Sequence, residues 1–496
     1  MIRDKKFTWG GEEHCRYIAD IAESYLAVLD RGLFSKEERA EIEEKFYALA
    51  IGQREFYNYG NYAQGIICGL NAAVGYIIGG KRGEEMISWA NRLLSYDDTW
   101  TLPENSRHYQ GLFIREMLRV ALYSNRMTIP DVDGWGLAWK SNFIRQVEWI
   151  IDTFPHNGFN PAYGRDYRQN YVDHFTVPLI VATTVLDDGN PEHLLLAKEA
   201  KWLLQEMFTY GTTHRVCDFG QNIYGYEAAQ WGPFAILLNP LYLYWFLNES
   251  LPPERPGPAH PGSRAVYRPM MPRGEIASVY DESLNAFKTQ PDKIIHRTGW
   301  EEGALFLMLD PAYPAAKSGE DKYSFANNLL SLSCGPEEFL TGVTMNFFNP
   351  DKTNNNLADI LESYIGAELV NWTNTDELSR SVTRLRDGKN TWTREITLYK
   401  TGDRRIEVKD TLSRRGSVYW HFQGTPQWRS GGVTLDVNGT RLDVTWEGAE
   451  RMTRRDRTTW SEPSHTRRWT YSGDPDREVK LYLAGPGTVV TTFRGL

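Results

Sequence analysis

The chain has 496 residues, of which 41% are hydrophobic and 24% charged, and its formal net charge is −9. It is too long for one ordinary core, so two or three domains are expected. No run of about 18 apolar residues is present, so we expect no membrane-spanning helix. No lysine- and arginine-rich run marks a nucleic-acid footprint, so nucleic acid is not an expected partner. The many aromatic residues, including 17 Trp and 27 Tyr, fit either a large core or a sugar-binding cleft.

The four cysteines, Cys15, Cys68, Cys217 and Cys334, share no metal-ligand spacing. No zinc motif is therefore visible. We expect no cofactor and no catalytic metal, and the presence of a structural ion stays open. The first residues have no hydrophobic signal core. The localisation stays open between the cytoplasm and a secreted or periplasmic protein whose signal peptide is absent from this chain. The oligomeric state also stays open.

The first half of the sequence has the three- and four-residue periodicity of helices. In residues 15–29, for example, Ile18, Ile21, Tyr25 and Val28 fall on one helical face. Ser35 and Glu38 form a capping-box pattern at the next helix start. Similar patterns predict helices over 62–78, 111–123, 142–154, 174–186, 193–208 and 232–247. Such a layer could be a bundle, a solenoid or a closed ring of hairpins, and no fixed sequence period marks a solenoid.

A proline-dense segment, residues 251–264, separates this half from a second half with strand patterns. Two-residue alternation and turn signals predict strands within 303–310, 393–412, 432–446 and 477–493. Asn438-Gly439 predicts a type I′ hairpin turn. The fold class predicted is α+β, with a helical domain at 1–250, a linker at 251–265 and an antiparallel β-sandwich at 266–496.

Three loop stretches before predicted helices concentrate polar and aromatic residues. They contain Asn58, Asn61 and Tyr62, then Glu104, Asn105, Arg107, His108 and Tyr109, then Tyr163, Arg165, Asp166, Arg168, Asp173 and His174. An asparagine and an arginine can bind a carboxylate and acidify the adjacent carbon, and a tyrosine or histidine can take the proton. That chemistry is β-elimination from a uronic acid. Two of Glu104, Asp166, Asp173 and Asp321 could instead serve as acid and base in glycoside hydrolysis.

Several short stretches and the order of the two halves resemble the heparinase II/III-like and alginate-lyase-like polysaccharide lyases. "ENSRHYQG" (104–111) is similar to a Glu-x-Ser-x-x-Tyr element, which implies that Tyr109 is the catalytic tyrosine. "NYGNYAQG" (58–65) stands where the family has its carboxylate-binding asparagine, which implies Asn61, with Asn58 as a rival. "NGFNPAYGRDY" (157–167) and "HRTGW" (296–300) resemble a loop and the entry to the β domain. The resemblance implies an incomplete (α/α) toroid followed by a β-sandwich.

The stretch "SGEDKYSF" (318–325) resembles the alginate-lyase-like string Gly-His-Tyr-Asp-Lys-Leu-Ser-Phe. The Asp-Lys pair is retained, but Gly319 stands in place of the histidine and Glu320 in place of the tyrosine. Three alternatives follow. His108 or His174 assists Tyr109, Glu320 has taken over in a hydrolase or an unusual lyase, or the protein binds glycan without cutting it. The family's metal-binding histidines also lack clear counterparts here.

The expected activity is therefore β-elimination on an anionic, uronic-acid-containing polysaccharide or oligosaccharide. Asn61 and Arg165 are expected to hold the carboxylate, Tyr109 to transfer protons, and His108 or His174 to assist. Residues expected to contact the substrate are Trp100, Glu104, Tyr163, Asp166, Trp231, Glu320 and Lys322. A glycoside hydrolase on the same scaffold and a non-catalytic glycan-binding protein are the alternatives.

Overall fold

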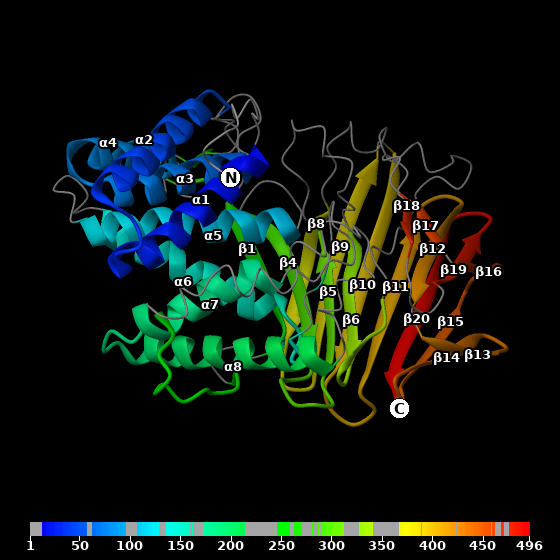
Figure 1. Cartoon of the computed structure of the whole chain (residues 1–496). Helices are drawn as coiled ribbons and strands as arrows, with labels where there is room; N and C mark the ends of the chain where they lie inside the picture. The colour runs from blue at the N-terminus through cyan, green and yellow to red at the C-terminus, as the bar shows by residue number, and fades with distance from the viewer. Residues whose placement is uncertain are drawn as a thin grey trace.

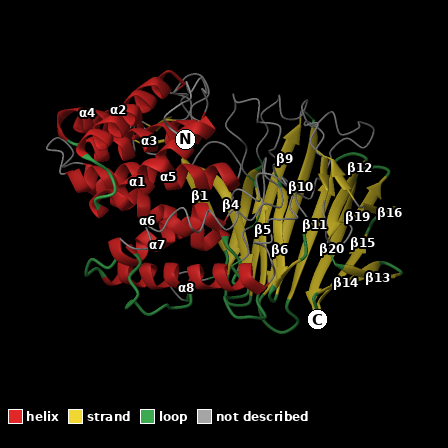
Figure 2. Cartoon of the chain, in the orientation of Figure 1, coloured by secondary structure: helices red, strands yellow, loops and turns green. Residues whose placement is uncertain are grey.

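A computed structural model describes most of the chain. The described residues are 12–56, 62–95, 107–127, 135–158, 161, 172–213, 246–257, 262–269, 280–281, 286–287, 289–311, 327–340, 367–387, 389–422, 424–457, 459–461, 468–470 and 476–496. Figures 1 and 2 show helices gathered on one side of this structure and strands on the other.

The helical side contains, among the described residues, eight α-helices. They are α1 (Glu12–Val28), α2 (Lys36–Gly52), α3 (Tyr62–Ile78), α4 (Gly80–Ser95), α5 (Arg107–Met127), α6 (Trp135–Thr153), α7 (Val172–Val185) and α8 (Pro191–Thr213). Every helix predicted from periodicity up to residue 208 is confirmed, whereas most of the predicted helix at 232–247 lies outside the described residues. None of the described helices is both long and apolar enough to cross a lipid bilayer.

Local signals fix two of the helix boundaries. The capping box at α2 is confirmed: the Glu38 backbone N–H donates to Ser35 Oγ at 3.1 Å, and the Ser35 N–H donates to Glu38 Oε2 at 3.0 Å. Helix α4 was not predicted. It follows α3 through a tight turn in which Gly79 (φ 65°) and Gly80 (φ 53°) adopt left-handed backbone values that glycine reaches at low cost.

The strand side contains two large antiparallel sheets and a smaller one. The first sheet has the order β1-β4-β5-β6-β7, the second β13-β14-β15-β20-β11-β10-β9-β8, and the third β12-β19-β16. Two short hairpins, β2 (Tyr280–Asp281) with β3 (Ala286–Phe287) and β17 (Thr459–Ser461) with β18 (Arg468–Thr470), complete the described strands. The sheet strands are β1 (Arg264–Pro269), β4 (Thr289–Arg297), β5 (Leu305–Asp310), β6 (Asn328–Cys334), β7 (Glu337–Glu338), β8 (Glu368–Asn374), β9 (Leu378–Asp387), β10 (Asn390–Tyr399), β11 (Arg405–Leu412), β12 (Gly416–Phe422), β13 (Thr425–Arg429), β14 (Gly432–Val437), β15 (Thr440–Glu447), β16 (Arg451–Arg457), β19 (Asp476–Leu483) and β20 (Gly487–Gly495).

The predicted hairpin turn between β14 and β15 is confirmed. Asn438 and Gly439 have φ values of 51° and 88°, and Val437 pairs with Thr440 across the turn. Positive φ at both central residues is the type I′ geometry, which matches the twist of the flanking strands.

Strand β5 shows how the layers are stacked. Phe306 and Met308 belong to the core formed with helices α5–α8, whereas Leu305, Leu307 and Leu309 belong to the core shared with the eight-stranded sheet. Because successive side chains alternate between faces, the first sheet is covered on both sides. This explains why the sequence of β5 is a continuous apolar run and lacks the polar alternation predicted for 303–310.

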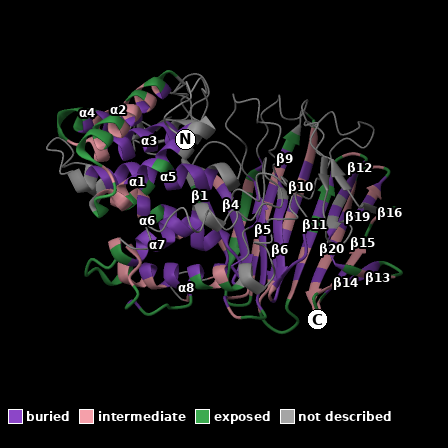
Figure 3. Cartoon of the chain, viewed as in Figure 1, coloured by how far each residue is buried: buried purple, intermediate pink, exposed green. Residues whose placement is uncertain are grey.

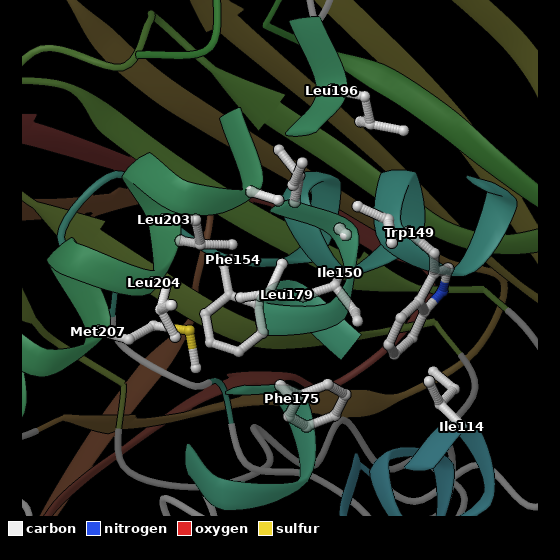
Figure 4. Packing of buried hydrophobic residues seen from close by; sticks show 14 of the residues in the cluster. Ile114, Trp149, Ile150, Phe154, Phe175, Leu179, Leu196, Leu203, Leu204 and Met207 are labelled. Atoms are coloured by element: carbon white, nitrogen blue, oxygen red, sulfur yellow. The ribbon is translucent and has the colours of Figure 1, made fainter. Parts of the chain in front are cut away.

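Figure 3 shows buried residues on both the helices and the strands, and one cluster of them joins α5–α8 to the first sheet. Figure 4 shows its aromatic centre, where the Phe175 ring lies 5.6 Å from that of Phe154 and 6.2 Å from that of Trp149, centroid to centroid. The segment predicted as a linker takes part in this core through Leu251, which is buried. The Lys201 ammonium holds the same segment by donating to the Leu251 carbonyl at 2.6 Å.

Candidate active site

The structure places only the backbone of a few predicted site residues. His108 and Tyr109 lie in the first turn of α5, and His174 lies in the first turn of α7. The remaining candidates lie outside the described residues: Asn61, Trp100, Glu104, Tyr163, Arg165, Asp166, Trp231, Glu320 and Lys322. The geometry around the candidate site therefore comes from the helices and strands that carry these segments.

Helices α3 and α5 pack closely, and glycines on α3 allow it. A Cβ placed on Gly65 would lie 3.0 Å from Phe113 Cδ2, and one on Gly69 would collide with the Glu116 carboxylate. Glycine inside a helix costs about 1 kcal/mol relative to alanine, so two of them on one face need a compensating contact. The compensation here is the close approach of α5. The residue numbers of the contact partners increase in the same direction along both helices, so α3 and α5 run parallel.

A third contact extends the same register to the other end of the pair. The rings of Tyr76 on α3 and Tyr123 on α5 lie 5.0 Å apart, centroid to centroid. In all three contacts, the difference in residue number between the partner on α5 and the partner on α3 is nearly the same. The two helices therefore stay aligned over several turns. Their first residues, Tyr62 and Arg107, therefore lie at the same end of the helix pair.

A buried network of charged side chains ties α5 to α1. The Arg119 guanidinium, which is fully buried, donates to Asp20 Oδ1 at 2.6 Å and to Glu23 Oε1 and Oε2 at 2.8 and 2.9 Å. It also donates to Glu116 on its own helix, and Glu116 Oε1 accepts from Arg115 at 2.8 Å. Removing one partner from such a network leaves buried charges uncompensated, which is strongly destabilising. The network therefore fixes the position of α5 against α1.

Two histidines with described side chains are buried and committed to structural contacts. Burial lowers the pKa of His156 to about 4, with a smaller contribution from the Arg297 charge, and its Nε2 lies 3.2 Å from the Glu302 carbonyl oxygen. Burial lowers the pKa of His296 to about 3, and its ring nitrogens lie 2.9 and 2.8 Å from the hydroxyls of Ser379 and Ser381. Both rings are neutral at pH 7. His156 is the first residue of the third polar stretch, which runs over 156–175, but neither His156 nor His296 was among the predicted site residues.

The "HRTGW" stretch forms the junction between the helical layer and the first sheet. The fully buried Arg297 guanidinium donates to the carbonyls of Asp152 and Phe154 at the end of α6, the latter at 3.0 Å. It also stacks 3.7 Å from the Trp300 ring centroid. A cation at a helix C-terminus complements the partial negative charge there. The motif recognised as an entry to the β domain thus caps α6 from the sheet side.

Segment 312–326, which contains "SGEDKYSF", returns to the described structure at Asn327. Asn327 has φ 66°, a left-handed value that asparagine tolerates. Its backbone N–H donates to the Asp310 carbonyl at 2.6 Å, its side-chain oxygen accepts from Thr383, and its carbonyl accepts from the Arg394 guanidinium at 2.9 Å. The return point of the segment is therefore held from three sides.

A chain of buried polar contacts extends from this return point into both sheets. Arg394 makes a two-pronged ion pair with Asp410, with N···O distances of 2.8 and 3.0 Å, and the Trp392 indole donates to the same carboxylate at 2.8 Å. All of these side chains are buried. A bidentate ion pair has a specific geometry. The pair between Arg394 and Asp410 therefore fixes β10 and β11 relative to each other next to Asn327.

At its other end, this series of buried polar contacts reaches the helical layer. Lys293, which is buried, donates to Asp310 Oδ1 at 3.4 Å and to Asp292 Oδ1 at 3.1 Å. The Trp149 indole on α6 donates to Asp292 Oδ2 at 2.7 Å. A continuous set of hydrogen bonds thus joins α6, the first sheet and the eight-stranded sheet. Among the residues that the structure describes, no group of three or more histidine, cysteine or acidic side chains is arranged to hold a metal ion.

The sequence analysis missed the charged network on α5. Its signal was "REMLR" (115–119), three charges at helical spacing within the apolar run from Leu112 to Tyr123. Charges on a face that is otherwise buried need partners, and this pattern predicts a buried ion network. The identity of the partners on α1 is not readable from the pattern, because they lie almost a hundred residues away.

Comparison with known proteins gave no match to any protein-family model and no match among curated proteins. Among solved structures, the chain is similar to heparinase III with a TM-score of 0.60 and 10% identity, over 100% of this chain and 71% of that chain. A second heparinase III structure gives a TM-score of 0.59 and 10% identity, over 99% and 68%. A chondroitin AC lyase from Streptomyces coelicolor gives 0.46 and 12% identity, over 98% and 68%, a likeness too low to carry an argument. The resemblance to heparinase-like proteins is thereby confirmed as a likeness of fold.

Proposed function

We propose that this protein is a polysaccharide lyase that cleaves an anionic, uronic-acid-containing glycan by β-elimination. The proposed scaffold is an incomplete (α/α) toroid at 1–250, a linker at 251–265 and an antiparallel β-sandwich at 266–496. The likeness of fold to heparinase III and the order of helices before sheets support this scaffold.

The observation that carries the proposal is the parallel packing of α3 and α5. Asn61 stands four residues before Gly65, and Tyr109 stands four residues before Phe113. Gly65 and Phe113 are in contact, and four residues are about one helical turn. Because Asn61 directly precedes α3 and Tyr109 lies in the first turn of α5, we propose that both act at the same end of the helix pair, an amide and a phenol on one sugar.

In the proposed mechanism, Asn61 and Arg165 bind the uronate carboxylate and stabilise the negative charge that develops when the C5 proton leaves. Tyr109, as the phenolate, takes that proton, with His108 or His174 assisting, and the resulting phenol returns the proton to the leaving O4 oxygen. The C4–O4 bond breaks while the C4–C5 double bond forms, and no water is consumed. The residues proposed to contact neighbouring parts of the substrate are Trp100, Glu104, Tyr163, Asp166, Trp231, Glu320 and Lys322.

The test is incubation with a panel of uronate glycans: alginate, glucuronan, heparan-type and chondroitin-type chains, and plant or bacterial gums. A lyase product has a double bond conjugated to the carboxylate and absorbs in the ultraviolet, which hydrolysis does not produce. New reducing ends without this absorbance would indicate a hydrolase using paired carboxylates such as Glu104 and Glu320. Binding without either product would indicate a non-catalytic glycan-binding protein.

Tyr109→Phe removes the proposed proton-transfer group and should lower kcat by about 10²–10⁴-fold without loss of folding. Tyr76→Phe is the matched control, because Tyr76 lies at the other end of the same helix pair and should retain activity. Asn61→Ala should lower kcat by about 10²–10³-fold, as for other preorganised donors. Full activity of the Tyr109 variant, measured by product absorbance, would show that another group transfers the proton.

A further inference from the structure

We propose that Gly65 and Phe113 are positioning residues, whose contact sets the distance between the first turns of α3 and α5, the two helix starts at which the proposed function has its chemistry. This inference rests on the proposed function, because it concerns the geometry of the same site. It assigns a role to two apolar residues that take no part in the chemistry.

The nearest atoms to a side chain at Gly65 all belong to α5. The three atoms nearest to a Cβ built on Gly65 are Phe113 Cδ2 at 3.0 Å, Glu116 Cβ at 3.5 Å and Phe113 Cα at 3.6 Å. The backbone of α5 thus lies almost at van der Waals contact with the position that a side chain would occupy. The separation of the two helices at this level is therefore set by the absence of a side chain on Gly65.

Neither partner can absorb an added methyl group without moving α3. Phe113 is 1% exposed and belongs to the core of α1–α5, so a shift of its ring would disturb the buried side chains around it. Helix α5 is held against α1 by the ion network of Arg119 with Asp20 and Glu23. An alanine at 65 should therefore displace the start of α3 by a few tenths of an ångström, one turn from the proposed carboxylate-binding residue.

The displacement should affect the chemical step more than substrate binding. Proton transfer requires the base and the bound carbon to be held in a narrow geometry, and a misplacement of about 1 Å can cost 10²-fold in rate. We expect Gly65→Ala to lower kcat by about tenfold and to change KM by less than about threefold. Phe113→Leu shortens the opposing side chain, so the Gly65→Ala/Phe113→Leu double variant should recover most of kcat.

Three further measurements make the test decisive. Gly52→Ala is the matched control, because a Cβ at this helical glycine meets nothing within 4 Å, and its kcat should equal that of the wild type. A crystal structure of Gly65→Ala should show the start of α3 displaced from α5. Gly69→Ala is not suitable, because its Cβ would collide with the buried Glu116 carboxylate and threaten folding.

The outcomes separate this inference from the proposed function. Loss of kcat in Gly65→Ala with recovery in the double variant supports the positioning role. Wild-type kcat in a Gly65→Ala variant with displaced α3, or lost kcat that Phe113→Leu does not restore, overturns it. Absence of elimination by the wild type on every glycan overturns the proposed function, and an undisplaced α3 in the Gly65→Ala structure overturns the packing argument whether or not the enzyme is active.

Discussion

Acidification should destabilise the protein through His156, a buried histidine where α6 meets the first sheet. His156 is 5% exposed, and burial lowers its pKa from 6.5 to about 4. The folded state therefore keeps the ring neutral between these two values, whereas the unfolded chain binds a proton below pH 6.5. Because the unfolded state binds more protons in this window, stability is lost as the pH falls from about 6.5 to about 4.

The magnitude follows from the two pKa values of His156. Each unit of difference corresponds to about 1.4 kcal/mol. At pH 5 the unfolded histidine is almost fully protonated and the folded one is almost fully neutral, so the loss relative to pH 7 is about 2 kcal/mol. This is a large part of the roughly 5–15 kcal/mol that separates folded from unfolded proteins.

The assay is urea denaturation of the wild type and His156→Gln at pH 7 and pH 5. Glutamine can still donate from its Nε2 toward the Glu302 carbonyl, which lies 3.2 Å from the histidine Nε2. It does not titrate, so the variant should lose about 2 kcal/mol less than the wild type between the two pH values. An equal loss in both proteins would refute the reasoning, because the acid sensitivity would then come from other groups.

Two further predictions concern the buried polar contacts beneath segment 312–326. Thr383→Val removes the hydroxyl that donates to the Asn327 side chain, and it should lower the unfolding free energy by about 1–2 kcal/mol in urea titrations. Thr491→Val is the matched control, since its buried hydroxyl has no hydrogen-bond partner among the described residues, and equal losses in the two variants would contradict the anchoring of Asn327. Trp149→Phe removes the indole N–H that donates to Asp292 at 2.7 Å, and it should cost about 1.5–3 kcal/mol because the acceptor is a charged, buried group. Thermal unfolding checks this value, and an unchanged midpoint would show that the bond across α6 and the first sheet adds nothing.

Features that depend on neighbours along the chain could be predicted from the sequence. The helical periodicity of α3 and the capping box of α2 involve residues at most four positions apart, and both predictions are confirmed. The Asn438-Gly439 turn was predictable for the same reason, because its backbone values depend on two adjacent residues.

Features that depend on distant contacts could not be predicted in this way. The partners of Arg119 on α1 are 96 and 99 residues away, so the charges on α5 indicated a network but not its members. The candidate site also depends on contacts between residues that are distant in the sequence. The sequence indicates polar loops before helices, but long-range contacts such as that between Gly65 and Phe113 are needed to relate the starts of α3 and α5. The roles of the individual site residues stay predictions.

The core shared by the helices and the first sheet bears on how this architecture could be recombined. Trp300, Phe306 and Met308 complete the apolar core of α5–α8, so a helical half cut at the proline-dense segment would expose that core to water. A chimera that exchanges β domains between relatives should instead keep the first sheet with the helices, and its new sheet must also fit the face of Leu305, Leu307 and Leu309, which belongs to the second core. The unit that can be inherited or transplanted intact is then larger than the composition change near residue 251 suggests.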